Sequence, residues 1–376
     1  MQCRTRYYLV PCTSCFPLLV FLPSLDSILS NLPSHDMLLG TCFLLTFLQI
    51  TIGQANAQNP VFNEKEVRFS NDSVQLAGTF IAPRQTTRGP AIVFLHGSGP
   101  ATRSGARPYA EEFTKLGIAS LIFDKRGSGA SGGSWITSSL TDLAHDALAA
   151  IKLLKTFDNV DTTQIGLWGV SQAGWVATLS ASQSTDVAFM TLISGGGASP
   201  RESELFSYRS TMQRAGISEN EIADAERVIN IYFTYLATGE NRADLVTELE
   251  RDRDKPWYKY ASLDKILPSE VNRVNWQWVA TWDPSPLIEK ISCPVLLMFG
   301  ERDTEFPTEI AVKKWRDGLK KAGNTNGTLM VFPGAGHGIR MREGFTGSGR
   351  PPFADGYAEA MIGWLWKHAV DTGTLR

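Results

Sequence analysis

The segment Gly169-Val-Ser171-Gln-Ala-Gly174 places a serine between small residues, which is the spacing that a nucleophile on a sharp turn requires. It follows the apolar run 165–168 and precedes a helical stretch over 172–183. Bulky flanking residues would clash with the neighbouring strand and helix. The turn would expose the Ser171 hydroxyl and aim the helix N-terminus at negative charge formed beside it. The segment therefore predicts that Ser171 is a catalytic nucleophile.

A second glycine-rich segment, His96-Gly-Ser98-Gly-Pro100, ends the apolar run 91–95. Acyl transfer builds negative charge on an oxygen, and backbone N–H groups in a glycine-rich turn can approach that oxygen closely. We expect the amides of Ser98 and Gln172 to form this oxyanion hole. The alternative is that the two glycines only turn the chain. Because His96 precedes the serine in sequence, we expect it to shape the loop and not to act as the base.

An acidic segment, Glu301-Arg-Asp303-Thr-Glu305, follows the apolar run 295–299. A carboxylate at the end of a strand can hold an imidazole in the tautomer that accepts a proton. We expect Asp303 to do so, with Glu301 and Glu305 as competitors. The alternative is a solvated acidic loop.

A histidine lies between glycines in Gly-Ala-Gly-His337-Gly, after the apolar run 329–332. Histidine carries protons near neutral pH because its ordinary pKa is about 6.5. The flanking glycines would let the ring swing from its loop toward the serine, so we expect His337 to be the catalytic base. His145 and His368 are weaker candidates because both lie within predicted helices.

The elements that would position these residues alternate between strands and helices from about residue 62 onward. Continuous apolar runs, typical of strands buried on both faces, lie at 91–95, 119–123, 165–169, 189–193, 295–299 and 329–332. Amphipathic helical stretches lie at 107–117, 139–157, 172–183, 307–322 and 356–369. The alternating patterns at 67–70 and 74–81 indicate antiparallel strands. The sequence predicts an α/β fold, with a mostly parallel sheet and helices on both faces.

The alternation stops at residues 201–285, which we expect to form a helical cap inserted between core segments 58–200 and 286–376. The helices expected there cover 202–215, 218–238 and about 268–282. The last helix would place Trp278 and Trp282 on one face, extended by Val271 and Val274. That face either packs the cap onto the core or lines a substrate pocket.

Residues 1–57 carry almost no charge and read as a leader. The apolar run after Met37 ends in Ala55-Asn-Ala57, the pattern of a secretory signal cleaved after Ala57. The run is too short for a membrane span, which needs about 20 apolar residues. We expect translation to start at Met37 and the protein to be exported to the periplasm or beyond, with no stable membrane span after processing. A retained membrane anchor is the alternative.

The composition excludes several classes of protein. Among 376 residues, 36 Lys and Arg against 38 Asp and Glu give a net charge of −2, so nothing indicates a nucleic-acid partner. With 20% charged and 43% hydrophobic residues the chain is ordinary globular protein. Beyond residue 42 only Cys293 remains, so this part cannot form an internal disulfide or a cysteine-based zinc site. We expect no metal, and the sequence leaves the oligomeric state open.

Two further motifs resemble those of the α/β-hydrolase family. Asp124-Lys-Arg-Gly-Ser-Gly-Ala-Ser131 resembles the turn after the fourth strand of that family, and 294–303 resembles its acid-bearing strand. The chain order of serine, acid and histidine is also that of the family. The resemblance covers roughly residues 64–370. One departure is Ala173, where the family usually has glycine.

Within the family, the two glycine-rich segments are similar to those of bacterial serine esterases distantly related to prolyl-oligopeptidase-like and dienelactone-hydrolase-like proteins. The resemblance implies a carboxylic-ester hydrolase without a cofactor, acting on a small-molecule ester. A serine peptidase acting on small peptides and a non-catalytic binding protein on the same scaffold are the alternatives. The acyl chain and the alcohol stay open because this fold hosts many chemistries.

Overall fold

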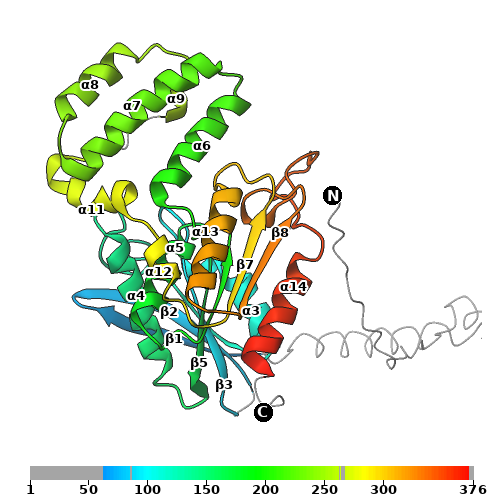
Figure 1. Cartoon of the computed structure of the whole chain (residues 1–376). Coiled ribbons are helices and arrows are strands. Elements are labelled where there is room, and N and C mark those ends of the chain that lie inside the picture. The colour runs from blue at the N-terminus through cyan, green and yellow to red at the C-terminus, as the bar shows by residue number, and fades with distance from the viewer. Residues whose placement is uncertain (1–61, 85–86, 262, 264–266, 372–376) are drawn as a thin grey trace, which may run out of the picture. The chain divides into compact units, whose positions relative to one another are not determined.

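The computed structural model describes residues 62–371 apart from 85–86, 262 and 264–266 (Figure 1). The described residues all belong to one compact unit, Pro60–Arg376. The predicted leader, with its start at Met37 and cleavage after Ala57, lies outside them. Within the described ranges, none of the helices combines the length and the apolar character that crossing a membrane requires.

An eight-stranded sheet forms the centre of this unit, in the order β1-β2-β4-β3-β5-β6-β7-β8. Its strands are β1 (Phe62–Asn71), β2 (Val74–Pro83), β3 (Gly89–Phe94), β4 (Ala119–Phe123), β5 (Val160–Val170), β6 (Phe189–Ile193), β7 (Val295–Gly300) and β8 (Gly327–Phe332). β2 runs antiparallel to β1 and to β4, and the other pairs are parallel. This confirms the predicted α/β fold, in which β4, β6 and β7 are buried along their whole length.

Helices cover both faces of the sheet. One face carries α4 (Leu140–Leu154), α5 (Ala173–Gln183) and α13 (Thr308–Lys321), and the other carries α3 (Arg107–Lys115) and α14 (Tyr357–Leu365). In α4 the apolar stripe is buried, and a capping box between Ser139 and Asp142 fixes the first turn. The parallel strands β3 to β8 therefore present their C-terminal ends at one edge between two helical layers.

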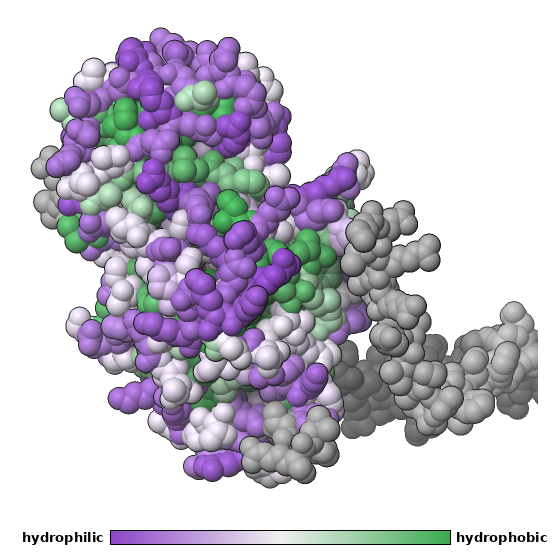
Figure 2. Space-filling model, in the orientation of Figure 1, coloured by the Kyte–Doolittle hydropathy of each residue, from purple (hydrophilic) through white to green (hydrophobic). Residues whose placement is uncertain are grey.

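A lobe of helices follows β6 and stands beyond the sheet (Figure 1). It contains α6 (Pro200–Arg214), α7 (Glu219–Thr238), α8 (Arg242–Arg251), α9 (Tyr258–Ala261) and α11 (Glu270–Thr281), and α12 (Ser285–Ile288) leads back to the core. The lobe has its own apolar cluster, which includes Ile229, Phe233 and Leu245. On the face shown in Figure 2 its outer surface is largely hydrophilic. It folds around a small core of its own.

Helix α11 joins the lobe to the core. Trp276 and Val279 pack against the apolar cluster of the lobe, whereas Trp278 and Trp282 pack against the cluster of the core. Val274, which we expected to extend the tryptophan face, is 61% exposed instead. Helix α11 therefore packs against both the lobe and the core, and neither of them covers Val274 in its N-terminal half.

Candidate active site

Ser171 occupies a sharp turn between β5 and α5. Its φ of 61° lies in the left-handed region, which is strained for a serine by about 1–3 kcal/mol. Two backbone hydrogen bonds hold the turn: the Ser171 N–H donates to Ile193 O (2.9 Å), and the Ser171 carbonyl accepts from Gly174 N–H (2.8 Å). The predicted strand–turn–helix setting of Ser171 is therefore present.

The glycines beside Ser171 are required by close backbone contacts. A Cβ at Gly169 would lie 2.2 Å from the Cβ of Ala173, and a Cβ at Gly174 would lie 2.3 Å from the backbone N of Gly196. Real Cβ atoms essentially never show such contacts. The alanine at 173, which departs from the family pattern, is accommodated because residue 169 has no side chain.

Asp303 and His337 are paired, as the sequence predicted. The Nδ1 of His337 lies 2.9 Å from Oδ2 of Asp303, whose side chain is fully buried. The other carboxylate oxygen, Oδ1, accepts the backbone N–H groups of Glu305 and Phe306, each at 2.8 Å. Of the competing acids, Glu305 lies 3.9 Å from Nε2 of His337, and Glu301 accepts from the N–H of Gly334 instead.

The surroundings of His337 favour its protonated form. Burial acts to lower the pKa of this imidazole, but the hydrogen bond and negative charge of Asp303 outweigh it, with a contribution from Glu305. The pKa is therefore raised above its ordinary value of 6.5. A nearby carboxylate that stabilises an imidazolium is what a general base needs as it takes up a proton.

The end of β6 connects the loops of Ser171 and His337. The carbonyl of Ile193 accepts the N–H of Ser171, and the next residue, Ser194, accepts the N–H of Gly338 through its hydroxyl (3.1 Å). The serine turn and the histidine loop thus meet at one edge of the sheet, on either side of β6.

The predicted oxyanion loop lies against the serine turn. A Cβ at Gly97 would be 3.9 Å from the Cβ of Ser171, so the two segments are in contact. Ser98 and Gln172 line the same cavity. In the described part of the chain, neither of their backbone N–H groups has a hydrogen-bond acceptor. Two free amides beside the serine hydroxyl can serve an oxyanion.

Lys125, which the sequence interpretation left without a role, ties this loop together. Its ammonium donates to the carbonyls of Gly97 (2.8 Å) and Gly99 (3.1 Å) and to Oε1 of Gln172 (2.8 Å). Burial lowers the pKa of Lys125 to about 8, against an opposing contribution from the charge of Asp146. One buried cation therefore fixes both segments that carry the free amides.

The neighbours of Lys125 anchor its loop. Asp124 accepts the N–H groups of Arg103 (2.8 Å) and Ala130 (2.9 Å). Arg126 makes a bidentate, buried ion pair with Asp146 of α4, with both distances at 2.7 Å. The Asp-Lys-Arg run that resembled the family motif could have drawn attention to Lys125.

His96 is not placed as a base. Its Nε2 lies 2.6 Å from the carbonyl oxygen of Phe123, and burial lowers its pKa to about 4. It is neutral near pH 7 and donates this hydrogen bond, which ties the start of the loop to β4.

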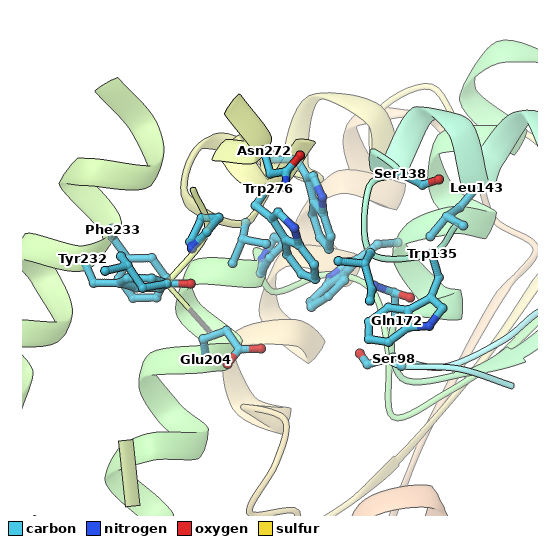
Figure 3. A pocket seen from close by; sticks show the side chains of 18 of the residues that line it. Ser98, Trp135, Ser138, Leu143, Gln172, Glu204, Tyr232, Phe233, Asn272 and Trp276 are labelled. Carbon is cyan, nitrogen blue, oxygen red and sulfur yellow. The ribbon is translucent and has the colours of Figure 1, made fainter. Parts of the chain in front are cut away.

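Two cavities are lined by the residues directly before and after Ser171, although Ser171 itself lines neither. Gln172, directly after it, lines a cavity of about 640 Å³ between the core and the helical lobe. Val170, directly before it, lines a second cavity of about 390 Å³ together with His337. Aromatic rings dominate the walls of the larger cavity, including those of Trp135, Trp175, Tyr208, Tyr232, Trp276 and Trp278 (Figure 3).

Among the residues described, no group of three or more His, Cys, Asp or Glu side chains could hold a metal ion.

Comparison with known proteins identifies the family. A model described as the alpha/beta hydrolase family matches residues 92–344, which is more than half of the chain. The chain therefore belongs to the alpha/beta hydrolase family.

The chain is also similar to individual known proteins. The chain is 25% identical over 250 residues to an uncharacterized 31.7 kDa protein of the traX-finO intergenic region of Escherichia coli, covering 62% of this chain and 79% of that protein. It is 33% identical over 112 residues to a thiohydrolase of Eupenicillium brefeldianum, covering 29% of this chain and only 35% of that relative. The structure of a Pyrococcus furiosus esterase superposes with a TM-score of 0.54 at 20% identity, covering 82% of this chain and 92% of that one, which shows a shared fold.

Proposed function

We propose that the protein is a serine hydrolase that cleaves carboxylic esters through an acyl-enzyme. The observation that carries this proposal is the meeting of a strained serine turn with a His337–Asp303 pair, separated by 2.9 Å, at one edge of the sheet. In this proposal Ser171 is the nucleophile, His337 is the base and Asp303 orients the imidazole.

The reaction would proceed in two displacements. Oγ of Ser171 attacks the ester carbonyl while Nε2 of His337 takes its proton, and the N–H groups of Ser98 and Gln172 stabilise the resulting oxyanion. The carbonyl re-forms, the C–O bond to the alcohol breaks, and His337 returns the proton to the leaving alcohol. Water, activated by His337, then attacks the acyl-enzyme and releases the acid and Ser171. The two cavities beside Ser171 give room for both halves of the ester.

Thioesters are a second candidate class of substrate. The similarity to a thiohydrolase favours them, and it is limited to 112 residues. The same acyl-enzyme forms from either class, because the two differ only in the leaving atom. Peptides are a third candidate class of substrate. Cleaving them places a larger demand on His337, because the leaving group that it must protonate is an amine.

The decisive variant is Ser171→Ala. We expect it to lose ester hydrolysis by about 10⁴-fold or more while it keeps its fold, because the hydroxyl is removed from a preformed turn. Labelling by a fluorophosphonate should disappear with it, and Ser182→Ala, at a half-buried serine near the C-terminal end of α5, serves as the control. Oxygen esters, thioesters and amides with one common acyl group should be compared by kcat/KM on the wild-type protein. Activity of Ser171→Ala within tenfold of wild type would exclude Ser171 as the nucleophile.

A further inference from the structure

The larger cavity contains a carboxylate that no cation balances. Glu204 of α6 lines this cavity and is half-buried. Among the described residues, its side chain has no hydrogen-bond partner and takes part in no ion pair. Burial raises the pKa of Glu204, and no neighbouring positive charge acts against that shift. Lys125, a cation that also lines the cavity, is bound to Gly97, Gly99 and Gln172.

Aromatic side chains line the cavity together with this carboxylate, namely those of Tyr208, Tyr232, Phe233 and Trp276. The guanidinium of Arg201 lies 5.4 Å from the centroid of the Phe233 ring, so the rings left for a ligand are those of the two tyrosines and Trp276. Tyr208 follows Glu204 by about one turn of α6, so the two side chains lie on the same face of that helix. Burial raises the pKa of Tyr208 and of Tyr232, and the charge of Glu204 adds to each shift. Figure 3 shows Glu204 on the same side of the cavity as Tyr232 and Phe233, while Ser98 and Gln172 lie on the opposite side.

This combination has a chemical meaning. A carboxylate without a partner in an apolar cavity is unfavourable, so it destabilises the empty site. An organic cation would remove that penalty, since it pairs with the carboxylate while ring faces attract its positive charge. A neutral or anionic group would gain neither interaction. The cavity thus has a reactive end at Ser98 and Gln172 and a cation-selective end at Glu204.

We propose that the Glu204 end of the cavity binds an organic ammonium group of the substrate, so that esters carrying a cationic end are preferred. This inference rests on the proposed hydrolase function, because the cation would hold the ester whose carbonyl lies at Ser171.

Binding can be measured without turnover on the Ser171→Ala protein. Choline and 3,3-dimethylbutan-1-ol have the same shape and differ in that a quaternary nitrogen replaces a carbon. We expect choline to bind at least tenfold more tightly by calorimetric titration. Glu204→Gln should abolish this difference, Glu204→Asp should retain part of it, and Glu240→Gln, which removes an exposed charge from the same lobe, should leave it unchanged.

Equal affinities for the two compounds in the Ser171→Ala protein would overturn the proposal, and so would a tenfold preference that survives Glu204→Gln. If Glu204→Gln does not fold, the comparison on the Ser171→Ala parent and on Glu204→Asp still decides the question. Choline binding in a protein that fluorophosphonates do not label would reject the hydrolase and keep the ammonium site. Fluorophosphonate labelling without a choline preference would reject the site alone.

Catalysis gives the second test. Pairs of esters that end in trimethylammonium or in tert-butyl, placed in the acyl half or in the alcohol half, should be compared across several chain lengths. We expect at least one cationic ester to exceed its neutral partner tenfold in kcat/KM, and this ratio should fall toward one in Glu204→Gln. Ratios near one for every pair on the wild-type protein would refute a cationic substrate.

Discussion

At the scale of single residues, Lys125 is the group whose replacement tests the oxyanion loop most directly. We expect Lys125→Met to lower kcat by roughly 10²-fold with a smaller change in KM, because the carbonyls of Gly97 and Gly99 and the amide of Gln172 lose their common donor. Above about pH 8 the wild-type ammonium loses its proton, so wild-type activity should decline there.

The Lys125→Met variant should lack that alkaline decline. Lys115→Met, which removes an exposed lysine paired with Glu112, is the matched control and should behave as wild type. A kcat for Lys125→Met within threefold of wild type would contradict a positioning role for Lys125.

His337 is expected to set the acidic limb of the pH profile. Its raised pKa means that the ring keeps its proton to a higher pH than a free histidine does. The base is neutral only above that pKa, so kcat/KM should rise with a midpoint above 6.5. Titration of the His337 ring by NMR should show the same value.

Asp303→Asn removes the largest contribution that raises the His337 pKa, so the NMR titration should shift to lower pH as burial dominates. Glu305→Gln should produce a smaller shift in the same direction, since its carboxylate lies 3.9 Å from Nε2. An unchanged pKa in Asp303→Asn would contradict the assignment of Asp303 as the orienting acid.

The catalytic candidates could be predicted because the residues next to them in the sequence form recognisable motifs. Ser171, Asp303 and His337 each follow a strand within a small- or acidic-residue motif, and the carboxyl ends of parallel strands meet at one edge. The run 329–332 was expected to be buried on both faces, but β8 lies at the edge of the sheet and only Phe332 in it is buried. Lys125 and Glu204 escaped prediction for a physical reason. The importance of Lys125 depends on acceptors supplied by distant segments, and that of Glu204 on the lack of a cation around it.

At the scale of elements, the contact between β5 and α5 leads to a prediction of stability. Gly169→Ala would place two Cβ atoms 2.2 Å apart, so the strand and helix must separate. We expect a loss of about 1–3 kcal/mol in the free energy of unfolding. Gly363→Ala is the control, because a Cβ there meets nothing within 4 Å and should stabilise α14 by about 0.5–1 kcal/mol. Chemical denaturation of both variants measures the difference, and equal stabilities would contradict the packing argument.

Element boundaries followed the hydrophobic pattern closely where elements are buried. The runs 119–123 and 189–193 coincide with β4 and β6. The pattern was less informative in the lobe, where α8 was not expected because its sequence is mostly polar. Leu245 and Leu249 form its short buried stripe, and they become recognisable only with α7 beside them.

At the scale of the whole molecule, the lobe and the core meet around the larger cavity. Trp278 of α11 packs edge-to-face on Trp175 of α5, with ring centroids 6.1 Å apart, and both line the cavity. The ion pair between Lys314 of α13 and Glu202 of α6 (2.7 Å) is a second connection. The tryptophan face of α11 was expected either to pack the cap onto the core or to line a pocket. Trp278 does both.

Replacing Trp278 should consequently affect both stability and substrate choice. We expect Trp278→Ala to lower the free energy of unfolding by about 3 kcal/mol, the low end for tryptophan because this ring is half-buried. The space it leaves should also move the preferred acyl chain toward longer homologues.

Trp278→Phe keeps an aromatic ring and removes an indole N–H that has no hydrogen-bond partner, so both effects should be smaller. Trp366→Ala, at a 50% exposed side chain directly after α14, should change neither property. Melting temperatures and kcat/KM across an acyl series on these three variants separate the outcomes, and an unchanged chain-length preference in Trp278→Ala would show that Trp278 only joins the lobe to the core.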